Sequence, residues 1–394
     1  MASVERRVRD GRVSWLARWR DPDGRQRTRS FARRVDADRF RSTVAADLVR
    51  GHYRDPDAGS EAFGPYALAW LAAQTFDAST AEAVESRLRL HALPTLGSMA
   101  LRQVRPSTIQ SWIRGLEHLA PTYRKVIYAN VSTIFTAAVD DELLTKNPCR
   151  APSVRRPRAE RASVVPWSRD QVLAVRAALP DRYGIVATLA AGLGLRQGEV
   201  FGLSPVDVDF LRGQVKIVRQ VKLFSRNRQV FALPKGRKTR TLPLPASVRD
   251  ELAAYLTQHP VKAVTLPWLH PGGEEHTVSL VVTSRESKAI NRNYFNTYVW
   301  KKALRETGVD PSRENGCHAL RHFYASALLD AGESIKAVSA HLGHSDPGFT
   351  LRTYTHLMPS SDERTRRAID AVLGVTEVYP AAEEQASPQA KGTF

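Results

Sequence analysis

Six polar side chains in the C-terminal half have types and spacings that suit phosphoryl transfer without a metal ion. They are Arg196, Lys235, His318, Arg321, His344 and Tyr354. Two guanidinium groups stay charged and match the oxygens of a phosphodiester bidentately. Lysine and histidine transfer protons, and a tyrosine hydroxyl, with an ordinary pKa of about 10, becomes a usable nucleophile beside several cations. The set predicts attack by a hydroxyl on a DNA phosphodiester and a phosphotyrosyl product.

The first of these residues follows a glycine-rich stretch, AAGLGLRQGEVFGL. We expect Gly192 and Gly194 to break one helix, and Arg196 and Glu199 to lie at the start of the next. At that position the guanidinium can reach out of the core. An ordinary ion pair between residues three apart on a helix explains the same spacing of Arg196 and Glu199.

The segment CHALRHFYASALLDAG predicts a second helix, with Gly332 as its C-terminal stop. His318 and Arg321 are three residues apart and share one face, which puts an imidazole beside a guanidinium. His318 and His322, four apart, would suit zinc, but the glutamate of the metalloprotease helix is missing between them. No metal site is therefore predicted.

The remaining candidates lie in two further segments. Gly343 ends a helix, His344 falls in the corner before a new helix opened by residues 345–347, and Tyr354 follows ten residues after the histidine. A half-buried packing role is the alternative interpretation of this tyrosine. Lys235 lies in RQVFALPKGRKTRTLPL, which predicts a basic hairpin turning around Lys235 and Gly236.

Together these motifs resemble those of the tyrosine recombinases, specifically the phage-type integrases, and the resemblance spans most of the chain. It implies that Arg196 and Arg321 clamp the phosphate and that Tyr354 is the nucleophile, forming a 3'-phosphotyrosyl intermediate. It also implies a reaction that needs no cofactor, metal or ATP.

The resemblance gives the other motif residues supporting roles. His344 would donate a hydrogen bond to the phosphate or the transition state, His318 would accept a proton from the nucleophile or orient it, and Glu199 would support the site. Lys235 would be the acid for the departing 5'-hydroxyl. The sequence Pro-Lys-Gly departs from the commoner Pro-Lys-Thr, and a shift of register would give this role to Lys238.

These residues must be positioned by a multidomain chain of 394 residues, because that length exceeds a usual single core. Residues 1–55 predict a small β-sheet plus a helix, in which Phe40, Val44, Leu48 and Val49 fall near helical spacing. Residues 51–60 are typical of a linker. Residues 62–152 predict an all-α bundle, and residues 165–374 an α+β catalytic domain. The resemblance assigns the first two to arm-type and core-type DNA sites and implies that the bundle and the catalytic domain clamp the DNA.

Two groups of arginines are candidates for DNA contacts. The first lies on or near the predicted N-terminal strands, and the second lies in a proline-interrupted connector that we expect to form no core. The first group is Arg18, Arg20, Arg25, Arg27 and Arg29, and the second is Arg155, Arg156 and Arg158. A solubilising role is the alternative for the connector, because charge runs are often only solvated.

The end of the chain carries less pattern. A helix over residues 362–373 has three apolar residues, and the resemblance implies docking on a neighbouring protomer, although docking within its own chain is equally compatible. Residues 375–394 lack an apolar period and predict a flexible tail.

Composition agrees with a nucleic-acid partner. Lys and Arg number 58 against 40 Asp and Glu, a net charge of +18. The two cysteines exclude a disulfide framework, and neither a spanning segment nor a signal peptide is visible. We therefore expect a cytoplasmic, nucleoid-associated protein with no membrane partner.

The resemblance implies partners beyond the DNA itself: three further copies in a synaptic homotetramer, and a host bending factor and an excisionase as possible accessory proteins.

Two other functions use parts of the same pattern. A type IB topoisomerase shares the chemistry, and an architectural DNA-binding protein that has lost catalysis shares the charge, although the complete set of six residues argues against the second. A metal nuclease is disfavoured, because no carboxylate cluster accompanies the motifs.

Overall fold

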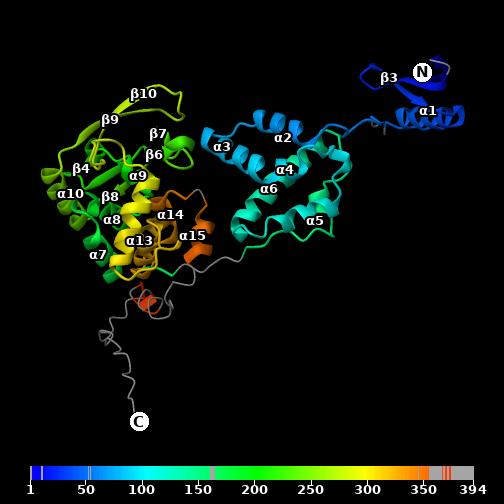
Figure 1. Ribbon diagram of the computed structural model, residues 1–394. Coiled ribbons are helices and arrows are strands. Elements are labelled where there is room, and N and C mark those ends of the chain that lie inside the picture. The colour runs from blue at the N-terminus through cyan, green and yellow to red at the C-terminus, as the bar shows by residue number, and fades with distance from the viewer. Residues whose placement is uncertain are drawn as a thin grey trace, which may run out of the picture. The chain divides into compact units, whose positions relative to one another are not determined.

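The computed structural model describes residues 2–9, 12–51, 53, 55–159, 165–344 and 346–354, with five more positions between 366 and 373. The chain divides into two compact units, residues 1–161 and 162–394 (Figure 1). Among the described residues, no helix has both the length and the apolar character needed to cross a bilayer. The predicted flexible tail and most of the predicted terminal helix lie outside the described residues.

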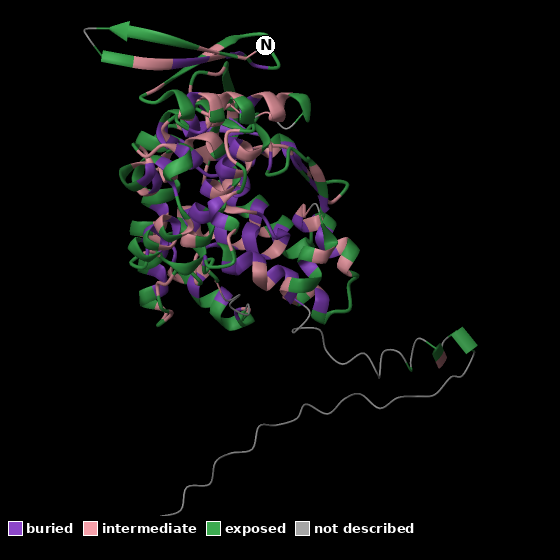
Figure 2. Cartoon of the chain, turned by 90° about the vertical axis from the view of Figure 1, so that its right-hand side faces the viewer, coloured by how far each residue is buried: buried purple, intermediate pink, exposed green. Residues whose placement is uncertain are grey.

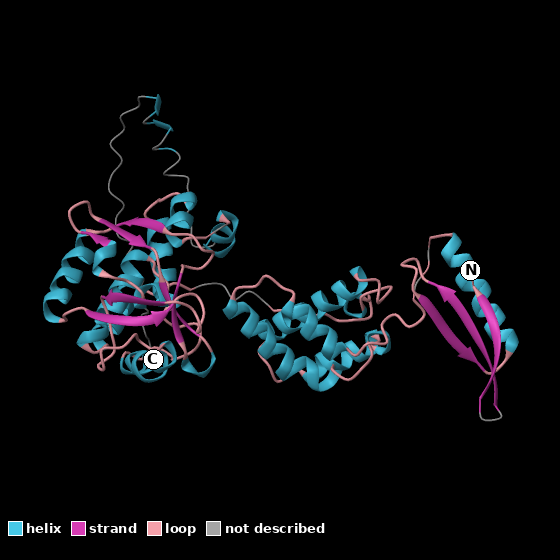
Figure 3. Ribbon diagram, turned by 90° about the horizontal axis from the view of Figure 1, so that it is seen from above, coloured by secondary structure: helices cyan, strands magenta, loops and turns pink. Residues whose placement is uncertain are grey.

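The N-terminal unit opens with an antiparallel sheet of three strands, drawn in Figure 3: β1 (Ser3–Arg9), β2 (Arg12–Arg20) and β3 (Gln26–Phe31). The turn between β2 and β3 places Gly24 at a φ of +80°, where a residue without Cβ is favoured. The Asp21 carboxylate accepts a hydrogen bond from the backbone N–H of Arg25 at 2.8 Å. The predicted hairpin is confirmed.

Helix α1 (Arg34–Val49) covers one face of this sheet. The Phe40 ring lies 5.2 Å from both Trp19 and Phe31, and Val44 is buried. The prediction that Val49 joins this face is wrong, since it is 89% exposed. Five residues beyond Val44, it lies about 140° around the helix and points to solvent.

The predicted linker, residues 51–60, is held by contacts near both of its ends. The Tyr53 hydroxyl accepts a hydrogen bond from the Trp19 indole N–H at 2.6 Å, which ties this part to the sheet. Farther along, the carbonyl of Gly59 accepts one from the Arg102 N–H at 2.9 Å, which ties the other part to the helices that follow.

Those helices form the predicted all-α bundle around one buried core. Local signals start several of them: Asp77 accepts hydrogen bonds from two N–H groups at the head of α3, and Pro106 and Pro121 open α5 and α6 at the positions where proline costs no hydrogen bond. The elements are α2 (Phe63–Ala72), α3 (Ala78–Arg87), η1 (Leu88–Ala92), α4 (Leu93–Leu96), η2 (Leu101–Gln103), α5 (Pro106–Gly115), α6 (Pro121–Asp140) and η3 (Pro148–Arg150).

The connector after the bundle differs in one respect from the prediction. Val154 is buried and belongs to the bundle core, so the first part of this arginine-rich stretch is packed. One apolar residue between charged neighbours is enough to fasten the chain, because its burial removes apolar surface from water. Residues 157–159 form neither a helix nor a strand, and residues 160–164 lie outside the described residues.

The C-terminal unit is built around α8 (Asp181–Leu193), whose side chains are buried on nearly every side; Figure 2 shows where buried residues gather. Such a helix is apolar all round because other elements cover all its faces. Its neighbours include α7, α9, α10 and α13. The helices before residue 310 are α7 (Arg169–Ala178), α9 (Gln197–Phe201), η4 (Pro205–Asp207), η5 (Ser225–Asn227), α10 (Ala246–Gln258), α11 (Arg292–Tyr294), η6 (Phe295–Trp300) and α12 (Lys301–Glu306).

The strands of this unit pair differently from the prediction. They are β4 (Val208–Asp209), β5 (Gln214–Ile217), β6 (Gln220–Leu223), β7 (Gln229–Ala232), β8 (Arg240–Pro243), β9 (Lys262–Pro267) and β10 (Glu275–Leu280). The hairpin at Arg212 and Gly213 is confirmed, but β7 and β8 do not pair across Lys235: β7 pairs with β6, and β8 pairs with β5. A tight turn before β7, with Arg226 and Asn227 at positive φ, instead connects β6 to β7 as a hairpin.

Three helices complete the unit: α13 (His318–Asp330), α14 (Ile335–Leu342) and α15 (Pro347–Tyr354). Gly332, at a φ of +88°, follows α13 as predicted. Gly192 does not break α8, which continues through Leu193 and ends at Gly194 in the left-handed region. The positive φ of Gly194 is therefore the turn that brings Arg196 to the head of α9.

Gly194→Ala tests this turn. A Cβ at Gly194 would lie 2.4 Å from Cδ1 of Tyr324 and would require φ of +63°. We expect a loss of about 2–4 kcal/mol in the free energy of unfolding, from left-handed strain plus overpacking. Gly308→Ala is the matched control, because its φ is +72° but nothing lies within 4 Å. Urea unfolding measures both, and equal losses would contradict the packing explanation.

Candidate active site

The C-terminal end of α14 collects three guanidinium groups. The carbonyls at a helix end lack intrahelical partners and carry the negative end of the helix dipole, so cations bind there. Gly343, at a φ of +63°, turns the chain away and leaves these carbonyls accessible to side chains. The pairs are Arg240 Nε with the carbonyl of His341 at 2.6 Å, Arg321 Nη2 with that of Leu342, and Arg196 Nη2 with that of Gly343 at 3.4 Å.

A single buried carboxylate joins two of these arginines. The Glu199 side chain is fully buried and accepts hydrogen bonds from Arg240 at 2.7 and 3.1 Å. It also accepts from the N–H and Nη1 of Arg196, both at 3.0 Å. Burial alone would raise the pKa of Glu199, but Arg240 and then Arg196 lower it below the ordinary value. Glu199 is therefore an anion that fixes Arg196 at the head of α9.

Arg321 is held in another way. It is 1% exposed, and its Nη1 donates to the carbonyl of Gly194 at 2.7 Å, so it spans the ends of α8 and α14. Burial and then Arg196 lower the pKa of Arg321 to about 9, which leaves it charged at neutral pH. Arg196 and Arg321 thus bond to adjacent carbonyls, those of Gly343 and Leu342, at the end of α14.

His344 lies beside Arg321 with both ring nitrogens engaged. Nε2 is 3.1 Å from Arg321 Nη2, and Nδ1 is 2.7 Å from the Thr350 hydroxyl. Because a guanidinium only donates, Nε2 must accept, and the ring proton is assigned to Nδ1. Burial, then Arg321, lower the pKa of His344 to about 4, consistent with a neutral ring. To donate to a phosphate through Nε2, this ring would first have to change tautomer or gain a proton.

Tyr354 ends α15 and is 2% exposed. Its hydroxyl is 2.6 Å from Nδ1 of His322, a residue that the sequence pattern had suggested only as a zinc ligand. Burial raises the pKa of Tyr354 to about 12, although Arg321 acts in the opposite direction. The phenol is therefore protonated in this state, and the cations nearby do not overcome its desolvation.

His318 begins α13 and packs edge-on against His322, with ring centroids 4.7 Å apart. The partner that the structure places on the tyrosine hydroxyl is therefore His322. Desolvation and then the nearby imidazole of His322 lower the pKa of His318, but the residue is exposed, so solvent screening weakens that shift.

The lysine candidates lie in the loop 233–239 between β7 and β8, next to the strand that carries Arg240. Lys235 and Lys238 are both exposed. Gly236 and Arg237 have positive φ, which makes this a tight turn beside the site. Both lysines remain candidates for the acid.

Arg240 and His322 are the site residues that the motifs did not single out. The sequence signal that could have identified Arg240 is a charged residue at the start of a strand whose other residues are Thr, Leu and Pro. The partners of Arg240 are 41 and 101 residues away in sequence. The signal for His322 was its position four residues after His318, which places both imidazoles on one helical face.

The N-terminal arginines divide between two faces of the sheet, because residues opposite each other on paired strands share a face. Arg27 lies opposite Trp19, and Arg29 opposite Ala17, so both lie on the α1 side. Arg27 is also engaged by the carboxylates of Asp21 and Asp55, and Arg29 lies over the rings of Phe31 and Phe40.

Arg18 and Arg20 lie on the face away from α1, and Arg25 is exposed in the turn. Arg18 pairs with Glu5 at 2.8 Å. Three arginines that the sequence reading did not select share this face: Arg7, Arg9 and Arg12. The face away from α1 is therefore the more basic one.

The connector arginines line a shallow hollow of about 790 Å³ together with Arg150. Arg155, Arg156 and Arg158 are all exposed. The N–H of Arg155 donates to the Gln110 side chain at 2.8 Å, which holds this stretch against α5.

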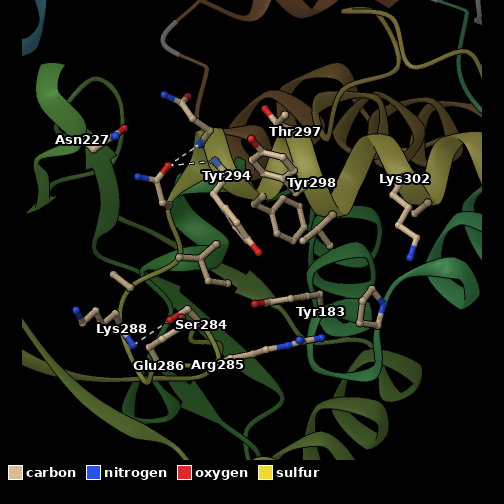
Figure 4. A pocket seen from close by; sticks show the side chains of 18 of the residues that line it. Tyr183, Asn227, Ser284, Arg285, Glu286, Lys288, Tyr294, Thr297, Tyr298 and Lys302 are labelled. Carbon is tan, nitrogen blue, oxygen red and sulfur yellow. Dashed lines mark hydrogen bonds between the residues drawn. The ribbon is translucent and has the colours of Figure 1, made fainter.

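A separate hollow of about 780 Å³ lies between η6 and the loop 284–291 (Figure 4). Tyr294 and Tyr298, both exposed, stand on its rim, and Arg285 lies near Tyr183 within it. None of the predicted catalytic residues lines it. Arg196, Arg321 and His344 lie instead at the C-terminal end of α14.

In the described part of the chain, no group of three or more His, Cys, Asp or Glu residues is arranged to hold a metal ion. Family models match two stretches: residues 169–361 match the phage integrase family, and residues 63–153 match the phage integrase central domain. The chain belongs to the phage integrase family. The first match contains all six predicted catalytic residues.

Relatives agree with this membership. A putative prophage phiRv2 integrase of Mycobacterium tuberculosis is 28% identical over 376 residues, which is 91% of this chain and 92% of the relative. A XerC-like tyrosine recombinase of Caldanaerobacter subterraneus is 30% identical over 58% of this chain and 61% of its own.

Solved structures share the fold. The Tn1549 transposon integrase in complex with circular intermediate DNA superimposes with a TM-score of 0.66 at 17% identity, over 79% of this chain and 100% of that one. A lambda integrase tetramer bound to a Holliday junction gives 0.54 at 16% identity, over 87% and 96%. The predicted combination of a small sheet with a helix, an all-α bundle and an α+β domain is confirmed.

Arg240→Met tests the buried ion cluster. Removing one partner leaves the carboxylate of Glu199, which has no exposed side-chain surface, with only Arg196. We expect a loss of about 3–5 kcal/mol in the free energy of unfolding. Lys302→Met, which removes an exposed pair with Glu306 at 3.7 Å, should change it by less than about 1 kcal/mol. Similar effects of the two substitutions in urea unfolding would show that the cluster is not important for stability.

Proposed function

We propose that this tyrosine recombinase, a DNA strand-transferring enzyme, cleaves and rejoins double-stranded DNA through Tyr354 to integrate or excise a mobile element such as a prophage. The observation that carries the proposal is the convergence of Arg196, Arg321 and His344 at the end of α14, with Tyr354 on the next helix. Arg196 and Arg321 come from separate segments and bond to neighbouring carbonyls at this helix end, so one phosphate could contact both guanidinium groups.

In the proposed reaction, Tyr354 Oη attacks the phosphorus and the bond to the 5'-oxygen breaks. The phenol proton passes to the imidazole of His318, the acceptor that the family resemblance implies. The phosphorus then carries a 3'-phosphotyrosyl ester, and the leaving oxygen takes a proton from Lys235 or Lys238. Charge that develops on the non-bridging oxygens is met by the fixed guanidinium groups of Arg196 and Arg321. Donors of this kind, already in place, are worth on the order of 10²–10³ in rate each, so neither a metal nor ATP is needed.

The state described here is a resting one in two respects. The phenol of Tyr354 is buried and protonated, and the Nε2 of His344 is engaged by Arg321. A DNA phosphate would compete with the helix carbonyls for Arg196 and Arg321. We infer that DNA binding rearranges these contacts and frees the donors for the phosphate.

The other parts of the chain are assigned to DNA binding at different sites. We propose that residues 62–152 contact core-type sites together with the catalytic domain, residues 165–374, and that Arg155, Arg156 and Arg158 follow the phosphate backbone between them. Residues 1–55 would bind arm-type sites through the sheet face that carries Arg18 and Arg20.

Assembly and location follow from the same proposal. The lambda integrase relative is a tetramer on a Holliday junction, and we propose a homotetramer on DNA here, with a host bending factor and an excisionase as possible accessory proteins. The place of action would be the bacterial cytoplasm at the nucleoid.

A type IB topoisomerase would use the same nucleophile and clamp. The match of residues 63–153 to the integrase central domain favours recombination. A catalytically inactive architectural protein is the remaining alternative, and the trapping experiment below separates it from an enzyme.

Tyr354→Phe should abolish the covalent protein–DNA adduct and leave DNA affinity within about twofold, because only the attacking oxygen is lost. A suicide substrate with a bridging sulfur at candidate junctions traps the adduct, and denaturing gels detect it. A denaturant-resistant band with the Phe variant would assign the nucleophile to another residue. If the native chain forms no adduct while binding DNA, the architectural alternative is correct.

Deleting residues 1–55 should remove binding to a second class of sites while cleavage at core sites persists. This cut keeps the Gly59 contact that holds the following segment to the bundle. Arg20→Gln, on the sheet face away from α1, should weaken arm-site binding about threefold or more, whereas Arg34→Gln on α1 should have little effect. Gel-shift titrations at fixed salt measure both, since phosphate contacts are salt dependent. Unchanged binding after the deletion would refute the arm-binding assignment.

A further inference from the structure

His322 is a half-buried polar group at the site that the proposed reaction has not used. Its Nδ1 is 2.6 Å from the Tyr354 hydroxyl, and the two rings are 5.6 Å apart. The tyrosine is 2% exposed, so this contact is shielded from competing water. A hydrogen bond in such surroundings holds its partner more firmly than one at the surface.

The direction of this hydrogen bond follows from the two protonation states. Burial and then Arg321 lower the pKa of His322 to about 4, so the ring is neutral at pH 7. Burial raises the pKa of Tyr354 to about 12, so the phenol keeps its proton. The phenol therefore donates, Nδ1 accepts, and the ring proton of His322 is assigned to Nε2. The large gap between the two pKa values argues against a proton transferred before DNA arrives.

The His322 ring contacts two other rings. His318, one turn earlier on α13, packs edge-on against it at 4.7 Å, and the Tyr354 ring lies 5.6 Å away. The backbone carbonyl of His322 also accepts a hydrogen bond from the Ser326 hydroxyl at 2.8 Å. Because Arg321 is the neighbouring residue, a single helix carries both the phosphate clamp and the acceptor that holds the nucleophile.

We propose that His322 is a positioning residue for the nucleophile: its neutral imidazole accepts the phenol hydrogen bond and sets the Tyr354 oxygen at a fixed place relative to Arg321. This inference rests on the proposed function. It assigns His322 the orienting role that the family resemblance gave to His318, while the His318 ring packs edge-on against that of His322. Displacing a reacting atom by about 1 Å can cost on the order of 10²-fold in rate, so such a contact matters.

The test compares three substitutions at one position. An asparagine places its amide oxygen near the position of Nδ1, so His322→Asn keeps an acceptor without keeping a base. His322→Ala removes the acceptor, and His322→Leu removes it while filling the space. We expect the Asn variant to form the phosphotyrosyl adduct within about tenfold of the native rate, and the Ala and Leu variants to be slowed about 10²-fold. DNA affinity should be unchanged in all three.

A matched control lies at the end of α10. The ring of Tyr255, a buried residue, stacks on that of His259 with centroids 4.4 Å apart, a second tyrosine–histidine contact that does not include the nucleophile. His259→Ala should leave the rate of adduct formation within about twofold. Single-turnover trapping on the sulfur-bridged substrate measures rates for the full-length chain, and thermal melting confirms that each variant is folded.

The outcomes separate this inference from the proposed function. If the native chain forms no adduct, the proposed function fails. If the native chain reacts and the Asn, Ala and Leu variants are equally fast, or if Asn is as slow as Ala, then positioning by a hydrogen-bond acceptor is refuted. Should the Ala variant melt at a much lower temperature, the comparison of Asn with Leu decides, because Leu fills the space without an acceptor.

Discussion

Three guanidinium groups meet at the last turn of one short helix, and the arrangement of the whole site depends on that concentration of positive charge. Carbonyls at the end of α14 accept from Arg240, Arg321 and Arg196 in succession. Helix ends bind cations favourably, but a partial charge of about −0.5 cannot neutralise three arginines. Glu199 supplies one full negative charge, and it is fully buried between two of them. The cluster thus keeps an excess of positive charge that an anion from outside would neutralise.

Burial strengthens the attraction of Arg321 for a phosphate, but it also weakens Tyr354 as a nucleophile. Low-dielectric surroundings increase the attraction between Arg321 and a phosphate, yet they also disfavour the tyrosinate form of Tyr354. Burial prevails over Arg321 in the free chain, because the pKa of the phenol is raised to about 12. A reactive anion is therefore not stored before substrate arrives. In the proposed reaction, DNA brings the phosphorus that makes loss of the phenol proton favourable, so cleavage depends on a bound target.

Local sequence patterns predicted those parts of the site that local rules determine. Glycines in the left-handed region end α8 and α14, so Arg196 and His344 could be placed at corners from the printed sequence alone. The positions of His318 and Arg321 on one helix follow from helical periodicity. Arg240 escaped prediction because its role depends on pairing of β8 with β5 and on contacts with Glu199 and α14, which no short window of sequence contains. The misassigned hairpin at Lys235 has the same origin.

His322 shows a different limit of prediction from sequence. Its place on α13 was predictable, but two histidines four residues apart fit a metal site, a packed pair or a hydrogen-bond acceptor equally well in sequence. The choice is made by α15, which returns to bring the Tyr354 hydroxyl to Nδ1. That return depends on Gly343 and on the hydrogen bond between His344 and Thr350, which join the end of α14 to α15. The contacts that hold the arginines and those that hold the nucleophile are therefore parts of one connected structure. A substitution at either end of α14 should therefore alter both the contacts of the arginines and those of Tyr354.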